Sequence, residues 1–253
     1  MRVVPRLMPT GVRDESHAGV TYHIEGELVP VLHIEMGTES VYFEHHVLLW
    51  KNVSVDIGLK SLAGGFKRLI AGLPIFMTEA RGPGHIGFSR DGAGQVFGLH
   101  LQPGQAIDVR EHQFLAATEG VDYNFTRVKG ISNMFFGGSG FFIDTFSCSS
   151  RPGILWLHGY GNVFEVTLEA GQQFDVEPGG WVYKDPTVMM ETQFQRFATG
   201  FFASVGQLFW NRFTGPGRVA IQSMYIHLPE GTEQGGSASS GGLGGVLGAI
   251  LDR

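Results

Sequence analysis

One spacing constrains this chain more than any other feature, because three glycines, Gly37, Gly104 and Gly171, lie 67 residues apart. Each glycine stands between two short segments in which apolar and polar residues alternate. The segments before the glycines are 32–34, 99–101 and 166–168, and those after them are 41–43, 107–109 and 174–176. Alternation with a period of two is typical of β-strands, and glycine adopts positive φ cheaply. The spacing therefore predicts a strand–turn–strand unit that occurs three times.

The second and third units align without a gap. Residues 91–109 and 158–176 share nine identities in nineteen positions, which is more than common turn chemistry explains and indicates a duplication. The first unit is more diverged. We expect an N-terminal extension at 1–23 and β-repeats at 24–90, 91–157 and 158–228. A Gly/Ser linker with a short apolar tail follows at 229–253, and its composition is typical of a flexible segment.

The later half of each unit also recurs. A short helix-like segment (65–71, 131–136, 202–205) precedes a strand (75–80, 141–146, 208–213), a proline–glycine turn and a last strand (85–88, 154–157, 218–221). The turn prolines are Pro83, Pro152 and Pro216, and proline does not occur in a central strand, so they mark sheet ends. Units with this many exposed edges are marginal alone. We expect them to pack as one body around an approximate threefold axis, as an all-β sandwich or barrel with short capping helices.

Charge and cysteine content exclude several classes of protein. A net charge of −6 and a pI near 5.9 argue against a nucleic-acid partner, which requires a basic footprint. The single cysteine, Cys148, forms no internal disulfide. The N-terminus lacks the apolar core of a signal peptide, and no apolar run reaches the length that spans a bilayer. We predict a cytoplasmic protein, with at most peripheral membrane contact through Lys67 and Arg68.

Ten histidines invite a metal interpretation, which the spacing does not favour. The tight pair His45 and His46 lies in a stretch, 44–50, that is predicted as a strand, and adjacent strand residues face opposite sides. His33 and His100 share a repeat position, which suggests structural equivalence. We therefore predict no metal ligands and no bound cofactor.

We also predict no catalytic residue. No Gly-x-Ser-x-Gly motif is present, and Cys148 stands before a turn, where a lone cysteine is usually inert. The glycine-rich stretches 91–94 and 158–161 lie between strands, with no helix after them to bind phosphate. Asp108 and Asp175 occupy equivalent positions, and outward-facing strand sites explain them better than a catalytic carboxylate pair does.

The tail carries apolar residues at helical spacing: Leu243, Val246, Leu247, Ile250 and Leu251. The stripe spans about two turns and is too short and glycine-rich to hold a helix alone in water. Two interpretations stay open, a frayed end or a segment that docks on the body or on a neighbouring subunit.

Four stretches together resemble a known family: 30–37, 65–70, 160–164 and, most specifically, Asn211-Arg-Phe-Thr-Gly-Pro-Gly217. The pattern over residues 22–227 is similar to the altered-inheritance-of-mitochondria family of the TRAP-like (tryptophan RNA-binding attenuator-like) superfamily. The resemblance implies a double-stranded β-helix built by internal duplication, self-association and no established catalytic residues. Residues 44–50 depart from that pattern, and the acidic charge gives no reason to carry over RNA binding.

These observations favour a non-catalytic scaffold or adaptor that self-associates as a trimer or a higher ring. The alternative is a small-ligand sensor with an apolar pocket between repeats, lined by Phe, Trp and Met. A cupin-like metal-dependent enzyme is the least favoured possibility.

Overall fold

The fold of the described residues is built from antiparallel β-strands, as the alternating sequence pattern predicts. The computed structural model describes residues 3–62, 76–128, 141–195 and 208–224, and all structural statements below concern these ranges. The helical element within them is one 3₁₀ turn, η1 (His45–Val47). The all-β prediction is therefore confirmed. No described helix has the length and apolar character needed to span a membrane.

The strands fall into an N-terminal group and three consecutive segments. The N-terminal group is β1 (Arg6–Leu7), β2 (Val12–His17) and β3 (Val20–Glu25). The first segment is β4 (Val31–Met36), β5 (Val41–Phe43), β6 (Leu48–Lys51), β7 (Asp56–Ser61), β8 (Phe76–Arg81) and β9 (Gly84–Phe88). The middle segment is β10 (Gly94–Leu101), β11 (Ala106–Arg110), β12 (Phe114–Thr118), β13 (Asp122–Val128), β14 (Phe141–Ser147) and β15 (Gly153–Tyr160). The last segment is β16 (Val163–Leu168), β17 (Gln173–Val176), β18 (Trp181–Lys184), β19 (Met189–Gln195), β20 (Leu208–Thr214) and β21 (Gly217–Gln222).

Strand pairing follows the same scheme in each segment. The first strand pairs with the sixth (β4·β9, β10·β15, β16·β21), and so does the third (β6·β9, β12·β15, β18·β21). The fifth strand pairs with the second (β5·β8, β11·β14, β17·β20) and with the fourth (β7·β8, β13·β14, β19·β20). Each segment therefore contributes two three-stranded halves to the sheets.

The third strand of each segment carries a register shift at the same point. It falls between Leu48 and Trp50 in β6, between Phe114 and Ala116 in β12, and between Trp181 and Tyr183 in β18. Such an irregularity leaves one residue unpaired and bends the strand locally. Because the three shifts correspond, they place Trp50 at the position equivalent to Ala116 and Tyr183. In the same way they place Lys51 at the position equivalent to Ala117 and Lys184.

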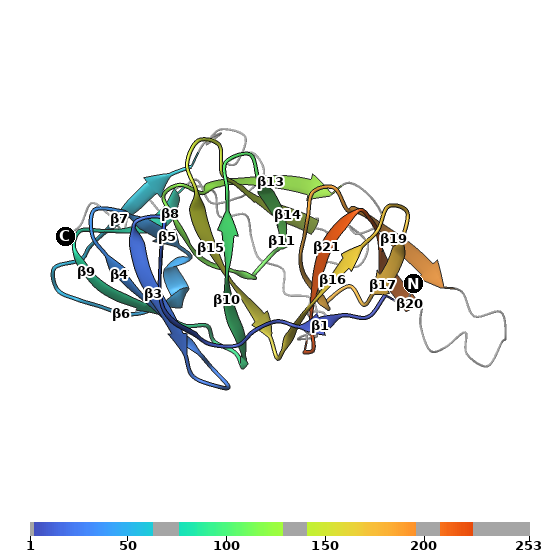
Figure 1. The fold of residues 1–253 in the computed structure, drawn as a ribbon, viewed down its shortest axis with the longest axis horizontal. Coiled ribbons are helices and arrows are strands. Elements are labelled where there is room, and N and C mark those ends of the chain that lie inside the picture. The colour runs from blue at the N-terminus through green and yellow to red at the C-terminus, as the bar shows by residue number, and fades with distance from the viewer. Residues whose placement is uncertain (1–2, 63–75, 129–140, 196–207, 225–253) are drawn as a thin grey trace, which may run out of the picture.

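Neighbouring segments join through two ladders, β5·β12 and β11·β18. The first produces the sheet β10-β15-β12-β5-β8-β7, and the second produces the sheet β1-β16-β21-β18-β11-β14-β13. The segments follow one another along the long axis, from β4 and β9 through β10 and β15 to β16 and β20 (Figure 1). Within the described ranges the first and last segments share no ladder. The predicted arrangement around a threefold axis is wrong.

The N-terminal residues extend this array at both ends. β2 and β3 form a hairpin that adds to β4, so the boundary predicted at residue 23 falls inside β3. From that hairpin the chain reaches back along the molecule, and β1 pairs with β16 of the last segment (Figure 1). The bulge in β2 between Val12 and Glu15 breaks the period-two pattern, which explains why the sequence gives no strand signal here.

The core consists of three clusters of buried side chains, one under each part of the array. Trp156 of β15 lies in the first cluster with 0% exposure, and its ring meets Tyr22 edge to face at 5.2 Å. Every residue of β12 and β18 is buried. Strands that are covered on both faces show continuous apolar runs rather than alternation, as these do.

The structure places the predicted turn residues as follows. Gly104 and Gly171 adopt φ of +86° and +75° between their strands, whereas Gly37 is not at positive φ. Pro83, Pro152 and Pro216 lie between the fifth and sixth strands of their segments, and the strands predicted on either side of them are confirmed. The predicted helices at 65–71, 131–136 and 202–205, and the tail at 229–253, lie outside the described residues.

The regular strand predicted over 44–50 is wrong in its first half. η1 occupies His45–Val47, with the Val47 amide donating to the Glu44 carbonyl at 3.1 Å, and β6 begins at Leu48. This turn directs Val47 into the core, where it is 1% exposed. Leu49 and Trp50 then remain 59% and 38% exposed on the edge strand that follows.

Candidate functional site

The junction between the middle and last segments shows how two segments are held together. In this ladder Lys184 lies opposite Asp108, and Tyr183 lies opposite Val109. Lys184 Nζ donates to Asp108 Oδ2 at 2.7 Å, and Thr145 Oγ1 donates to the other carboxylate oxygen at 2.8 Å. The lysine is only 6% exposed, so the ion pair is a largely desolvated contact.

The junction between the first and middle segments uses the same strand positions with apolar residues. Ala116 lies opposite Phe43, and Ala117 lies opposite Tyr42. All four side chains are at most 1% exposed. At both junctions, therefore, the two residues that follow the bulge in the third strand are buried against the second strand of the preceding segment.

The corresponding positions at the start of the array are exposed. β6 forms the outer strand of the sheet β2-β3-β4-β9-β6, and no described strand pairs with its outer edge. Trp50 is 38% exposed at the position of Ala116, and Lys51 is exposed at the position of Lys184. Val53, just after the strand, is 97% exposed. This end carries apolar side chains and a lysine with no described strand opposite them.

The other end of the array is open in a complementary way. β17 forms an outer strand of the sheet β17-β20-β19, and it too has no described strand on its outer edge. Asp175 occupies the position of Asp108 and accepts two hydrogen bonds of 2.7 Å from the Arg212 guanidinium. The hydrogen bonds from Arg212 lower the pKa of the Asp175 carboxyl, so it is an anion at neutral pH. Val176, its neighbour, is 7% exposed.

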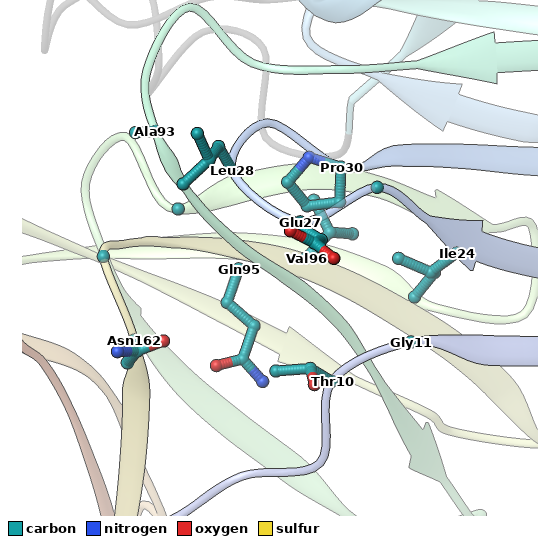
Figure 2. A pocket seen from close by; sticks show the side chains of 13 residues that line it. Thr10, Gly11, Ile24, Glu27, Leu28, Pro30, Ala93, Gln95, Val96 and Asn162 are labelled. Carbon is teal, nitrogen blue, oxygen red and sulfur yellow. The ribbon is translucent and has the colours of Figure 1, made fainter.

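A pocket of about 180 Å³ lies where the N-terminal arm, the segment between β1 and β2, crosses the middle of the array (Figure 2). Its wall is formed by residues from the arm, the β3–β4 turn, β10 and the β15–β16 turn: Thr10, Gly11, Ile24, Gly26, Glu27, Leu28, Pro30, Ala93, Gly94, Gln95, Val96, Gly161 and Asn162. None of these is the Phe, Trp or Met that we predicted for a pocket between repeats.

The main polar group of this pocket already has partners. Gln95 donates to the carbonyl oxygens of Pro9 at 2.7 Å and Met8 at 3.3 Å, and it accepts from the Val163 amide at 3.0 Å. Figure 2 shows its amide directed at the arm beside Thr10. Ligand sites are usually larger, at about 300–1,000 Å³, with unsatisfied polar groups that fix a ligand. Gln95 is better explained as the contact that holds the arm in place.

Three further side chains that can carry charge or react are buried in or next to the middle segment. Arg90, 6% exposed, donates to the Phe114 carbonyl at 2.8 Å and to Glu44 Oε2 at 3.1 Å. Burial first, and then the Arg90 charge, lower the pKa of His158 to about 4. Cys148 is 1% exposed, and burial raises the pKa of its thiol, so the thiolate form is disfavoured at neutral pH.

The two carboxylates singled out from the sequence lie apart in the structure. Asp108 and Asp175 belong to different sheets, and each is paired with its own cation. His33 stacks on His23 at 4.3 Å, and one ligand atom from each of His23, Glu25 and His33 lies within 4.8 Å of the other two. Sequence reasoning missed that group, although His23-x-Glu25 and His33 flank a hairpin turn. It also did not distinguish the exposed Lys51 from the buried Lys184 at the equivalent position, because that difference depends on which strands pair.

Comparison with known proteins agrees with this fold. An X-ray structure of a protein from Streptococcus pyogenes, solved by a structural genomics consortium, superposes with a TM-score of 0.62 at 22% identity, covering 81% of this chain and 94% of that one. No curated protein matches the chain. The sequence profile of the family described as "Mitochondrial biogenesis AIM24" matches residues 22–224. The resemblance seen in the sequence is thereby confirmed, and the chain belongs to the AIM24 family.

Proposed function

We propose that this protein is a non-catalytic, self-associating scaffold whose copies join head to tail, with β6 of one copy pairing with β17 of the next. One observation carries the proposal. Two complete sheets arise where the third strand of a segment pairs with the second strand of the preceding segment. The half-sheets β4-β9-β6 and β17-β20-β19 lack that pairing within the described residues, and together they would reproduce it.

The recurrence of strand pairing supports the finer fold that the resemblance implies. Six strands with one pairing scheme and one bulge position in each segment are what we expect of three copies of a single double-stranded β-helix unit. If the units are equivalent, surfaces buried between them inside the chain are suited to burial between chains. The open ends are then interfaces of the same kind as the internal junctions.

The internal junction also predicts the register. Lys51 corresponds to Lys184, and Asp175 corresponds to Asp108, so Lys51 of one copy would lie opposite Asp175 of its neighbour. Trp50 would lie opposite Val176, as Tyr183 lies opposite Val109. Pairing would bury the exposed indole and desolvate the ion pair.

An interface of this kind is heterologous, because two different surfaces meet. Repeated application gives a ring if the rotation closes and a filament if it does not. A trimer or larger ring, in the cytoplasm, is our prediction from the sequence, and the head-to-tail edges fit an assembly without twofold symmetry. The role in the cell would then be to present many copies of one surface to partner proteins.

Charge reversal at the predicted pair tests the proposal. We expect wild-type protein to form oligomers in sedimentation velocity and native mass spectrometry, and Lys51→Glu or Asp175→Lys to shift the distribution toward monomer. The double variant Lys51→Glu/Asp175→Lys should restore association, because each interface again joins opposite charges. Asp91→Lys serves as a matched control, since its side chain is 81% exposed in the middle of the array.

The outcomes separate the possible routes of association. A wild-type chain that stays monomeric at all concentrations, or single variants that associate like wild type, would rule out the edge pairing. The tail residues Leu243, Val246, Leu247, Ile250 and Leu251 offer another route, outside the described residues. Truncation after Leu228 leaves edge-driven oligomers intact and abolishes tail-driven ones.

A further inference from the structure

Three potential metal ligands share the outer face of the β3–β4 hairpin. Side chains alternate along a strand, so Tyr22 and Ile24, at 2% and 3% exposure, face the core, and His23 and Glu25 face the other way. On β4, Leu32 and Ile34 are fully buried, which places His33 on the same outer face as His23. The group lies outside the core and is therefore unlike an interior cupin site.

The register brings the three side chains together. His23 lies directly opposite His33 in the β3·β4 ladder, and their rings stack with centroids 4.3 Å apart and planes within 13°. Glu25 Oε1 is 3.8 Å from His33 Nε2. One ligand atom from each residue lies within 4.8 Å of those of the other two. The register therefore brings two imidazoles and one carboxylate close enough to share a single ion.

Two neighbours complete the surroundings. Asp14, in the bulged part of β2, has Oδ1 at 3.5 Å from His23 Nδ1. On the other side the Trp50 ring lies 5.6 Å from His33 and covers Gly87, where a Cβ atom would come within 2.2 Å of the indole nitrogen. The group therefore has an orienting carboxylate on one flank and an aromatic wall on the other.

We propose that His23, His33 and Glu25 bind a divalent first-row transition-metal ion, with Zn²⁺ as the species that fits best. Imidazole suits zinc, copper, iron and nickel, whereas magnesium and calcium prefer ligand sets made only of oxygen. Tetrahedral zinc bonds of about 2.0–2.2 Å place ligand atoms roughly 3.4 Å apart, so small side-chain rotations bring the three into range. Asp14 acts as the outer carboxylate that holds the His23 ring, an arrangement common around zinc-bound histidine. The proposed site differs from the metal-free prediction made from the sequence, and it does not depend on the proposed self-association.

Calorimetric titration of the full-length protein with Zn²⁺ in a non-chelating buffer tests this site. We expect saturation at one ion per chain, loss of binding in His23→Ala and His33→Ala, and a weakening of about 10–100-fold in Asp14→Asn. His100→Ala is the matched control, because His100 also stacks on a histidine, His17, at 4.4 Å and faces Glu15. Its affinity for Zn²⁺ should equal that of wild type.

A spectroscopic readout locates the ion independently. Cu²⁺ or Ni²⁺ bound beside Trp50 should quench part of the tryptophan fluorescence, and that part should be missing in Trp50→Phe and unquenched in His33→Ala. Circular dichroism establishes that each variant is folded. Absence of saturable Zn²⁺ binding, unchanged binding in both histidine variants, or loss of binding in His100→Ala would each overturn the proposal.

Discussion

The buried imidazole of His158 predicts a specific loss of stability in mild acid. Its side chain is 1% exposed, and its pKa falls from the usual 6.5 to about 4 in the folded protein. The unfolded chain binds the proton more readily, so the stability linked to this group is complete above pH 6.5 and is lost as the pH falls toward 4. Between pH 7.5 and pH 5 the loss amounts to about 2 kcal/mol, and over the whole range it approaches about 3 kcal/mol.

Urea unfolding at a series of pH values measures this loss. Other groups titrate as well, and the pKa values of His33 and His100 are also lowered by burial, so the informative quantity is the difference from a variant. His158→Gln removes the titration and should flatten the profile by about 2 kcal/mol between pH 7.5 and pH 5, whatever its stability at pH 7.5. Parallel profiles for wild type and His158→Gln would refute the reasoning.

Three further predictions concern stability in urea. Gly104→Ala should lower the free energy of unfolding by about 1 kcal/mol, because φ is +86° but no atom lies near the added methyl group. Gly94→Ala should instead prevent normal folding, because its Cβ would lie 2.1 Å from a backbone oxygen. Trp156→Ala should cost about 3–5 kcal/mol by opening a cavity in the core, and a cost below 1 kcal/mol would contradict full burial. Lys184→Met should cost about 3–5 kcal/mol by stranding the Asp108 carboxylate, and the added Asp108→Asn change should recover much of it.

Much of the strand content could be predicted from sequence because period-two alternation reports burial on one face. The strands β11 and β17, which follow Gly104 and Gly171, alternate between more buried and more exposed residues, and both glycines adopt the positive φ that a tight turn requires. Strand prediction from alternation failed where the backbone geometry departs from a regular strand. The 3₁₀ turn after Glu44 interrupts the strand that we predicted over 44–50. The bulge in β2 shifts the alternation by one residue, so no strand was predicted there.

The candidate sites could not be predicted because they depend on which strands meet. Asp108 and Asp175 are equivalent in sequence, yet Asp108 is paired inside the chain and Asp175 stands at its open end. Only the ladder that places Lys184 opposite Asp108 makes Lys51 significant. The proposed metal ligands were missed for a similar reason, since His23 and His33 become neighbours only when the hairpin fixes their register.

The charges at the two open edges bear on which pairing they would select. An unpaired edge strand is a liability that natural proteins usually manage with charges, bulges or a covering segment. Here the edge at β6 carries a lysine, and the edge at β17 carries an aspartate at the matching position. Joining two β6 edges would bring two Lys51 side chains onto one four-residue ladder, and joining two β17 edges would do the same with Asp175. Like charges across a ladder destabilise it, whereas opposite charges contribute favourably. The same residues that discourage edge-to-edge aggregation therefore favour the head-to-tail contact, and reversing both charges in one chain preserves that preference.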